Sequence, residues 1–146
     1  MHPHPTLTLD QCVIYQIYPM SFQDSDGDGM GDIKGIRQRL DYLAMLGVDL
    51  LWLTPVYRSP RRDNGYDVAD YSAIDPAFGT LAEMDLLIAE AAAHGMGIMM
   101  DIVANHTSTE HAWFRQALAG DPRYQAYYVF RDQTFVDAHP LDSIFG

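Results

Sequence analysis

Three polar residues that could do chemistry, Asp101, Asn105 and His106, follow an apolar run that begins at Gly97. An apolar run of this length after a helical pattern predicts a buried parallel strand. Polar side chains at the carboxyl ends of parallel strands are where α/β folds place their ligands. The stretch therefore indicates a binding site. The alternative is that Asp101 and Asn105 only cap the next turn and that His106 is a loop residue.

A second group of candidate residues lies in an acidic loop with the spacing of a calcium-binding loop. Positions 1, 3, 5 and 9 of this loop are Asp24, Asp26, Asp28 and Asp32, with Gly29 at position 6 and Met30 at position 7. Ca²⁺ takes oxygen ligands, mainly carboxylates and carbonyls. We predict that the four Asp side chains and the Met30 carbonyl bind Ca²⁺. The loop is not an EF-hand, because Gly35 replaces the bidentate Glu and a strand precedes it; the alternative is a solvated acidic loop.

A third group lies in the long connection 56–80, which is expected to be irregular, around the turn Asp63-Asn64-Gly65-Tyr66-Asp67. Asn-Gly is a turn signal and would project Tyr66 and Asp67 from the same side of the sheet as His106. An aromatic face stacks on the apolar C–H face of a sugar, and a carboxylate accepts hydrogen bonds from its hydroxyls. Together with Asp101 and His106, the turn predicts part of a sugar pocket.

The elements that must position these residues alternate along the chain. Strands are predicted over 12–18, 48–53 and 97–103, and helices over 36–46, 81–94 and 111–119, while 1–11 and 124–146 read as irregular. The order β-α-β-α-β predicts a parallel sheet with right-handed crossovers. No G-x-G-x-x-G follows the first strand, which favours a barrel over a dinucleotide-binding fold. The predicted class is α/β: about three β/α units, the N-terminal part of an incomplete (β/α)8 TIM barrel.

Composition excludes several classes of partner. The net charge of −11 disfavours nucleic acid and anionic membranes. The single cysteine, Cys12, cannot form an internal disulfide. No signal peptide is recognisable, and no apolar run approaches the ~20 residues of a membrane span. A cytoplasmic location is expected.

Several motifs, in order along the chain, resemble glycoside hydrolase family 13, the α-amylase family. The stretch from Asp101 to His106 is similar to the first signature of that family. The other motifs lie at 13–19, 31–32, 52–55, 64–67 and 106–108. They resemble the α-glucosidase branch that contains oligo-1,6-glucosidases and trehalose-6-phosphate hydrolases. The resemblance runs from Val13 to about Asp132, and 133–146 departs from the family's pattern.

The resemblance implies a role for each residue of the site. Tyr66 would stack against the non-reducing glucose, Asp67 would hydrogen-bond its hydroxyls, and His106 would contact the same ring. Asp101 would hold the shape of the pocket, and Asn105 would brace the neighbouring loops. The acidic loop matches the calcium loop of the branch, which makes Ca²⁺ a structural cofactor.

The resemblance also implies what this chain does not contain. Residues 1–123 would be the N-terminal portion of the catalytic barrel, and 124–146 the start of an inserted second domain. The family's nucleophile and acid/base carboxylates follow strands four and five. No carboxylate of this chain matches those positions, and none is assigned a catalytic role.

We therefore expect the front part of a monomeric, retaining α-glucosidase that hydrolyses short α-glucosides, and we expect this chain to be inactive alone. An oligo-1,6-glucosidase is slightly favoured over a trehalose-6-phosphate hydrolase, and sucrose and maltose stay open as substrates. Two alternatives are a non-catalytic module that binds calcium or carbohydrate, and a piece that complements a separate chain of a split enzyme.

Overall fold

A three-stranded parallel sheet forms the centre of the computed structural model, which describes residues 8–138. Its strands are β1 (Ile14–Ile17), β2 (Leu50–Leu53) and β5 (Gly97–Met100), in the order β1-β2-β5. Both neighbouring pairs are parallel and keep one register along their length. The predicted parallel sheet is confirmed, although β5 ends three residues earlier than the predicted 97–103.

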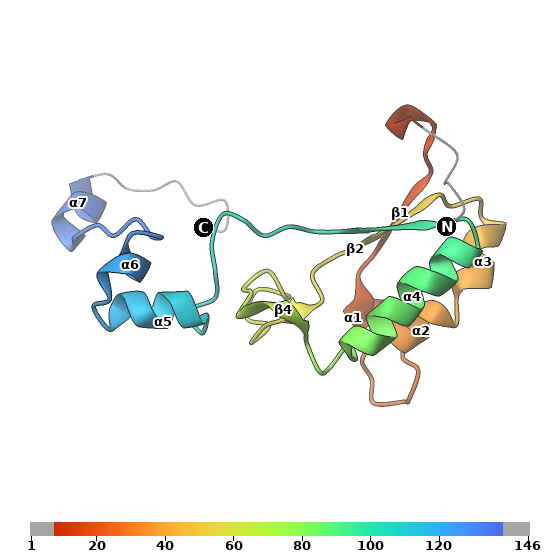
Figure 1. Cartoon of the computed structure of the whole chain (residues 1–146), viewed down its shortest axis with the longest axis horizontal. Coiled ribbons are helices and arrows are strands. Elements are labelled where there is room, and N and C mark those ends of the chain that lie inside the picture. The colour runs from red at the N-terminus through yellow and green to blue at the C-terminus, as the bar shows by residue number, and fades with distance from the viewer. Residues whose placement is uncertain (1–7, 139–146) are drawn as a thin grey trace.

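Helices connect the strands and pack against one face of the sheet (Figure 1). After β1 come α2 (Ile33–Arg37) and α3 (Leu40–Met45), and α4 (Leu81–Ala93) precedes β5. Their apolar side chains form a core with Ile17 and Leu53, which are fully buried. This is the arrangement of consecutive β/α units in a barrel, and the described residues do not close a barrel.

Local capping sets the helix boundaries. Thr80 Oγ1 accepts from the Glu83 N–H at 3.2 Å, and the Glu83 carboxylate accepts from the Thr80 N–H at 2.8 Å. The first helix differs from its prediction, because it begins at Ile33 rather than Ile36. Asp32 caps this earlier start, and a break at 38–39 divides the predicted helix into α2 and α3.

The face of the sheet opposite the helices carries residues that lie next to the candidate site. Gln16, Trp52 and Met99 lie beside one another in register on β1, β2 and β5. Ile14, two residues before Gln16 and therefore on the same face, is 41% exposed. In a barrel, this face of the strands points toward the interior.

The connection 56–80 contains a hairpin, contrary to the prediction of an irregular loop. β3 (Tyr57–Arg58) pairs antiparallel with β4 (Asp70–Ile74), and the register shifts between Tyr57 and Arg58. A two-residue strand is too short to show an alternating pattern. The hairpin holds the two ends of the 59–69 loop, which carries Tyr66 and Asp67.

The last described helices lie away from the sheet, beyond an extended segment that follows β5 (Figure 1). They are α5 (Ala112–Leu118), α6 (Pro122–Gln125) and α7 (Gln133–Ala138). The first confirms the predicted third helix. The other two show that 124–125 and 133–138 are helical rather than irregular, whereas 126–132 form neither helix nor strand. The predicted domain boundary after residue 123 falls inside α6 and stays a prediction. Residues 139–146 lie outside the described part of the chain.

Two short helical turns flank β1. The first, η1 (Leu9–Gln11), corrects the irregular reading of 1–11 at its last three residues, because the Gln11 N–H donates to the Thr8 carbonyl at 2.9 Å and closes a turn; residues 1–7 lie outside the described part of the chain. The second, α1 (Pro19–Phe22), begins at a proline, whose fixed φ suits the first helical position. Within residues 8–138, no helix combines the length and apolarity that a membrane span requires.

We predict that the contact between α3 and α4 depends on pH through His94. Its Nε2 lies 2.9 Å from Asp41 Oδ1, and its Nδ1 lies 2.8 Å from the Glu90 carbonyl oxygen. The Glu90 carbonyl, followed by the Asp41 carboxylate, raises the pKa of His94 above its usual value. The stabilisation is therefore fully present below the unfolded pKa of about 6.5 and is lost as pH rises through the folded pKa.

His94→Gln should consequently lower Tm more at about pH 5.5 than at about pH 9, as measured by thermal unfolding of both proteins. Equal losses of Tm at the two pH values would contradict this assignment.

Candidate functional site

The Asp101 carboxylate, directly after β5, joins a sheet residue to a loop residue. Its Oδ1 accepts from Trp52 Nε1–H at 2.6 Å, and its Oδ2 accepts from the Tyr66 hydroxyl at 2.7 Å. Burial, and then the hydrogen bond to Asp101, raise the pKa of Tyr66 to about 12. Tyr66 is therefore a neutral phenol at physiological pH, with its ring held beside the carboxyl ends of the strands.

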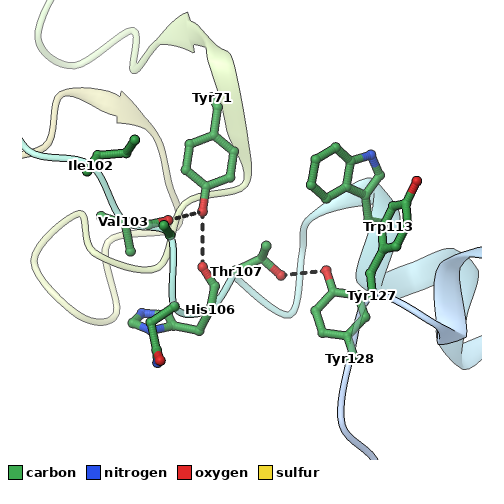
Figure 2. Close-up of a pocket in the computed structure, with 10 residues that line it drawn as sticks. Tyr71, Ile102, Val103, His106, Thr107, Trp113, Tyr127 and Tyr128 are labelled. Carbon is green, nitrogen blue, oxygen red and sulfur yellow. Dashed lines mark hydrogen bonds between the residues drawn. The ribbon is translucent and has the colours of Figure 1, made fainter.

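His106 lies at the end of the extended segment and contacts the same loop. Its Nε2 lies 3.2 Å from the Tyr66 carbonyl oxygen, and its Nδ1 lies 3.3 Å from the side-chain nitrogen of Asn105. The Tyr71 hydroxyl lies 2.6 Å from the Val103 carbonyl oxygen and 3.0 Å from that of His106, as Figure 2 shows. Tyr71 thus links β4 to the segment that carries His106.

Asp67 follows Tyr66, and its carboxylate is bound by its own loop. Oδ1 accepts from the Ser59 hydroxyl at 2.7 Å and from the Asp63 N–H at 3.2 Å, while Oδ2 accepts from the Arg62 N–H at 3.0 Å. Burial acts to raise the pKa of Asp67, but these hydrogen bonds outweigh it and lower the pKa below its usual value. Asp67 is ionised and fixed in orientation.

Two cavities lie beside these residues. One, of about 520 Å³, is lined by Gln16, Tyr18, Thr54, Asn64 and Tyr66. The other, of about 330 Å³, lies between the segment after β5 and the last helices, and its lining includes His106, Thr107, Trp113 and Tyr128 (Figure 2). The structure therefore brings His106 and Tyr66 into contact but opens them to different cavities, and Asp67 and Asp101 line neither of the two.

The acidic loop gathers three of the four predicted carboxylates. Carboxylate oxygens of Asp24, Asp26 and Asp28 lie within 4.8 Å of one another. Backbone N–H groups, above all those of Gly27 and Gly29, lower the pKa of Asp24. Three clustered carboxylates are oxygen ligands of the kind that Ca²⁺ takes, so the residues fit the predicted metal.

Asp32, the fourth predicted ligand, has other partners. Its Oδ2 accepts from the Ser25 N–H and hydroxyl at 3.1 and 2.7 Å, and its Oδ1 accepts from the Gly35 N–H at 2.6 Å. Asp32 therefore closes the loop onto α2, and it lies outside the group of three carboxylates. Met30, whose carbonyl was the fifth predicted ligand, is partly buried against the core.

Several residues of the site were not found from the sequence. Trp52 and Thr54 lie at the carboxyl end of β2, and their period-two spacing from Leu50 was a signal that both face one side of the sheet. Asp75 accepts from the N–H of Ser59, the first residue of the 59–69 loop, across 16 residues of sequence, and no local pattern joins the two. Only the fold brings this pair together.

Comparison with known proteins identifies what this arrangement is similar to. The chain matches the family described as "Alpha amylase, catalytic domain" over residues 16–146, so the match continues beyond Asp132, where we expected it to end. The trehalose-6-phosphate hydrolase of Escherichia coli (strain K12) is 58% identical over 120 residues, which are 82% of this chain and 22% of that protein. An oligo-1,6-glucosidase of Halalkalibacterium halodurans is 55% identical over 122 residues, 83% of this chain and 22% of that protein.

Solved structures agree. The crystal structure of Bacillus licheniformis trehalose-6-phosphate hydrolase superposes with a TM-score of 0.80 and 49% sequence identity, covering 83% of this chain and 22% of that one. The chain thus spans about a fifth of the length of these relatives.

We predict that Tyr66 and Asp101 are energetically coupled. Tyr66→Phe removes the hydroxyl donor and Asp101→Ala removes the acceptor, so each variant abolishes this bond and the double variant should lose less stability than the sum of the two; Asp101→Asn removes only the charge of the acceptor. The coupling should be about 1–2 kcal/mol, because the acceptor is a partly buried charged group. The free energy of unfolding of the four proteins, from denaturant titration, measures it.

Tyr42→Phe is the control for that cycle, because Tyr42 is 46% exposed on α3. Combined with Asp101→Ala, it should be additive. Additivity of Tyr66→Phe with Asp101→Ala would refute the coupling.

Proposed function

The chain belongs to the α-amylase family, glycoside hydrolase family 13, and from this premise we propose that the whole protein is a retaining α-glucosidase that hydrolyses short α-glucosides. The relatives described above carry the names of α-glucoside hydrolases. No described carboxylate is assigned as nucleophile or acid/base. The residues of this chain bind and orient the sugar, and we infer that the chain alone does not hydrolyse it.

The observation that carries this proposal is the cluster of Trp52, Tyr66 and Asp101 at the carboxyl ends of the parallel strands, beside the larger cavity. A sugar offers apolar C–H faces to an aromatic ring and hydroxyls to polar groups. In the described part of the chain, Thr54 Oγ1 is the buried side-chain polar atom that lacks a hydrogen-bond partner, and Thr54 lines this cavity.

Each residue has a proposed role in binding the non-reducing glucose. Tyr66 stacks on the ring, Asp67 accepts hydrogen bonds from its hydroxyls, and His106 contacts the same ring. Asp101 holds Tyr66 in place through their hydrogen bond, and Asn105 braces the segment next to His106.

The proposed substrate is an isomaltose-type oligosaccharide, as for an oligo-1,6-glucosidase, with trehalose 6-phosphate next. Arg62 is exposed near the turn and forms an ion pair with Glu110 at 3.3 Å, so it is a poor candidate for a phosphate ligand. We further propose a cytoplasmic monomer that does not bind nucleic acid, consistent with the charge of −11.

The activity prediction concerns Asp67. In the whole protein, Asp67→Asn should lower kcat/KM for p-nitrophenyl α-glucoside and isomaltose by about 100-fold, because hydrogen bonds to a charged group are the stronger ones. Asp85→Asn, on the exposed side of α4, is the control and should leave kcat/KM unchanged. Absence of hydrolysis by the wild-type protein would refute the proposed function. Near-normal kcat/KM in Asp67→Asn would remove Asp67 from the site.

We also propose that Asp24, Asp26 and Asp28 bind a structural Ca²⁺, with the Met30 carbonyl as a further ligand. The support is the close approach of the three carboxylates, whose mutual repulsion a divalent cation would relieve. Asp32 would act by closing the loop onto α2 rather than as a ligand, because its carboxylate lies outside the group of three and caps α2 through the Gly35 N–H.

Removal of Ca²⁺ should therefore lower Tm. Ca²⁺ at 100 times its Kd should stabilise the protein by about 2.7 kcal/mol, and Mg²⁺ should do less because it keeps more of its water. Thermal unfolding after chelation and after each metal is restored measures this. Asp28→Asn should abolish most of the response, while Asp10→Asn, exposed on η1, should keep it. A Tm that is insensitive to Ca²⁺ would refute the metal site.

A further inference from the structure

The Ser59 hydroxyl is the side-chain group that holds the Asp67 carboxylate. Ser59 is 8% exposed, and its Oγ lies 2.7 Å from Asp67 Oδ1 and 2.9 Å from the Asp67 carbonyl oxygen. The same Oγ accepts from the Arg61 N–H at 2.9 Å. A serine hydroxyl has one hydrogen to donate, so both its donor and one acceptor position are committed within this loop.

Asp75, just after β4, fixes Ser59 in turn. Its Oδ2 accepts from the Ser59 N–H at 3.2 Å, and its Oδ1 accepts from the Ala77 N–H and from Arg61 Nη1, both at 3.0 Å. Asp75 is 5% exposed, so these bonds compensate a buried charge. A chain of hydrogen bonds therefore runs from β4 through Ser59 to Asp67.

The backbone of Arg61 in this loop has a conformation that residues with a side chain disfavour. Its φ of 58° lies in the left-handed region, which side-chain-bearing residues rarely adopt. The ion pair with Asp75 and the hydrogen bond to Ser59 both end on Arg61. Backbone strain of this kind persists where the surroundings determine the conformation, and it is common at ligand-binding sites.

We propose that Ser59, fixed by Asp75, is a positioning residue that orients Asp67 for recognition of a sugar hydroxyl. An ionised carboxylate has about four acceptor positions. Ser59 and Asp63 occupy two on Oδ1, and Arg62 occupies one on Oδ2. Of these donors, Oδ1 therefore receives two and Oδ2 one, and the bond from Ser59 to Oδ1 limits rotation of the carboxylate. This inference rests on the proposed function, in which Asp67 binds hydroxyls of the α-glucoside.

A purely structural role would have a different signature. If Ser59 and Asp75 only stabilise the loop, loss of the hydroxyl should lower Tm without changing the Asp67 carboxylate or the affinity for substrate. If Ser59 positions Asp67, the carboxylate itself must respond. Ser72 offers a matched control, because its hydroxyl donates to Asp70 Oδ1 at 2.6 Å outside this network, and this bond likewise lowers the pKa of Asp70.

The test compares Ser59→Ala, Ser59→Thr and Ser72→Ala in the whole protein. NMR titration of Asp67, steady-state kinetics on p-nitrophenyl α-glucoside and thermal unfolding are measured for each. Ser59→Ala should raise the pKa of Asp67 and raise KM about tenfold with little change in kcat, because binding is lost equally in ground and transition states. Ser59→Thr keeps the hydroxyl and should restore both quantities. Ser72→Ala should leave both at their wild-type values.

Two results would overturn the proposal: an unchanged Asp67 pKa in Ser59→Ala, or a KM that stays at the wild-type value while only Tm falls. Absence of hydrolysis by the wild-type protein would instead overturn the proposed function. The two failures are distinguishable, because the Asp67 titration reports whether Ser59 controls the carboxylate whether or not the protein turns over a glucoside.

Discussion

The hydrogen bonds of Asp101 to Trp52 and Tyr66 join the parallel sheet to the irregular 59–69 loop. Trp52 belongs to the central strand, while Tyr66 lies on a loop that begins six residues after β2 ends. A carboxylate placed between an indole N–H and a phenol satisfies two donors that would otherwise lie partly buried without a partner. Because β5 fixes the Asp101 backbone, the position of Tyr66 follows from strand register. The Asp101 side chain thereby ties the loop to the rigid sheet.

Hydrogen bonds from nearby groups stabilise several carboxylates of this acidic chain. Asp67 and Asp24 are held mainly by hydrogen bonds from hydroxyl and N–H groups, and Asp75 is held by two N–H groups and one arginine. Neutral donors of this kind stabilise a carboxylate without neutralising its charge. Held in this way, Asp67 and Asp24 stay ionised, which suits hydroxyl donors and divalent cations as ligands.

The sequence predicted the elements whose apolar residues form a run or recur at a regular spacing. The apolar runs near 15, 50 and 100 gave the three parallel strands, and the Thr80–Glu83 pair located the start of α4. The hairpin was missed because β3 has two residues, and the division between α2 and α3 was missed because the apolar spacing continues across 38–39. The polar cluster after β5 was recognisable from residue types. Ser59 and Asp75, which hold Asp67, were not, because only tertiary contacts bring them together.

Contacts within the folded chain also explain why the roles of Asp32 and Asp67 differ from those that their sequence motifs predict. Both were predicted as ligand-binding carboxylates from their spacing, and both accept hydrogen bonds from their own loops. Asp32 has donors on both oxygens, one of which caps α2, so closing the loop accounts for its position. Asp67 has the same number of donors as Asp32, two on one oxygen and one on the other, so the donor count does not distinguish the two carboxylates. The two carboxylates differ in where their donors lie: one donor of Asp32 is the N–H of Gly35 in α2, whereas all three donors of Asp67 belong to its own 59–69 loop.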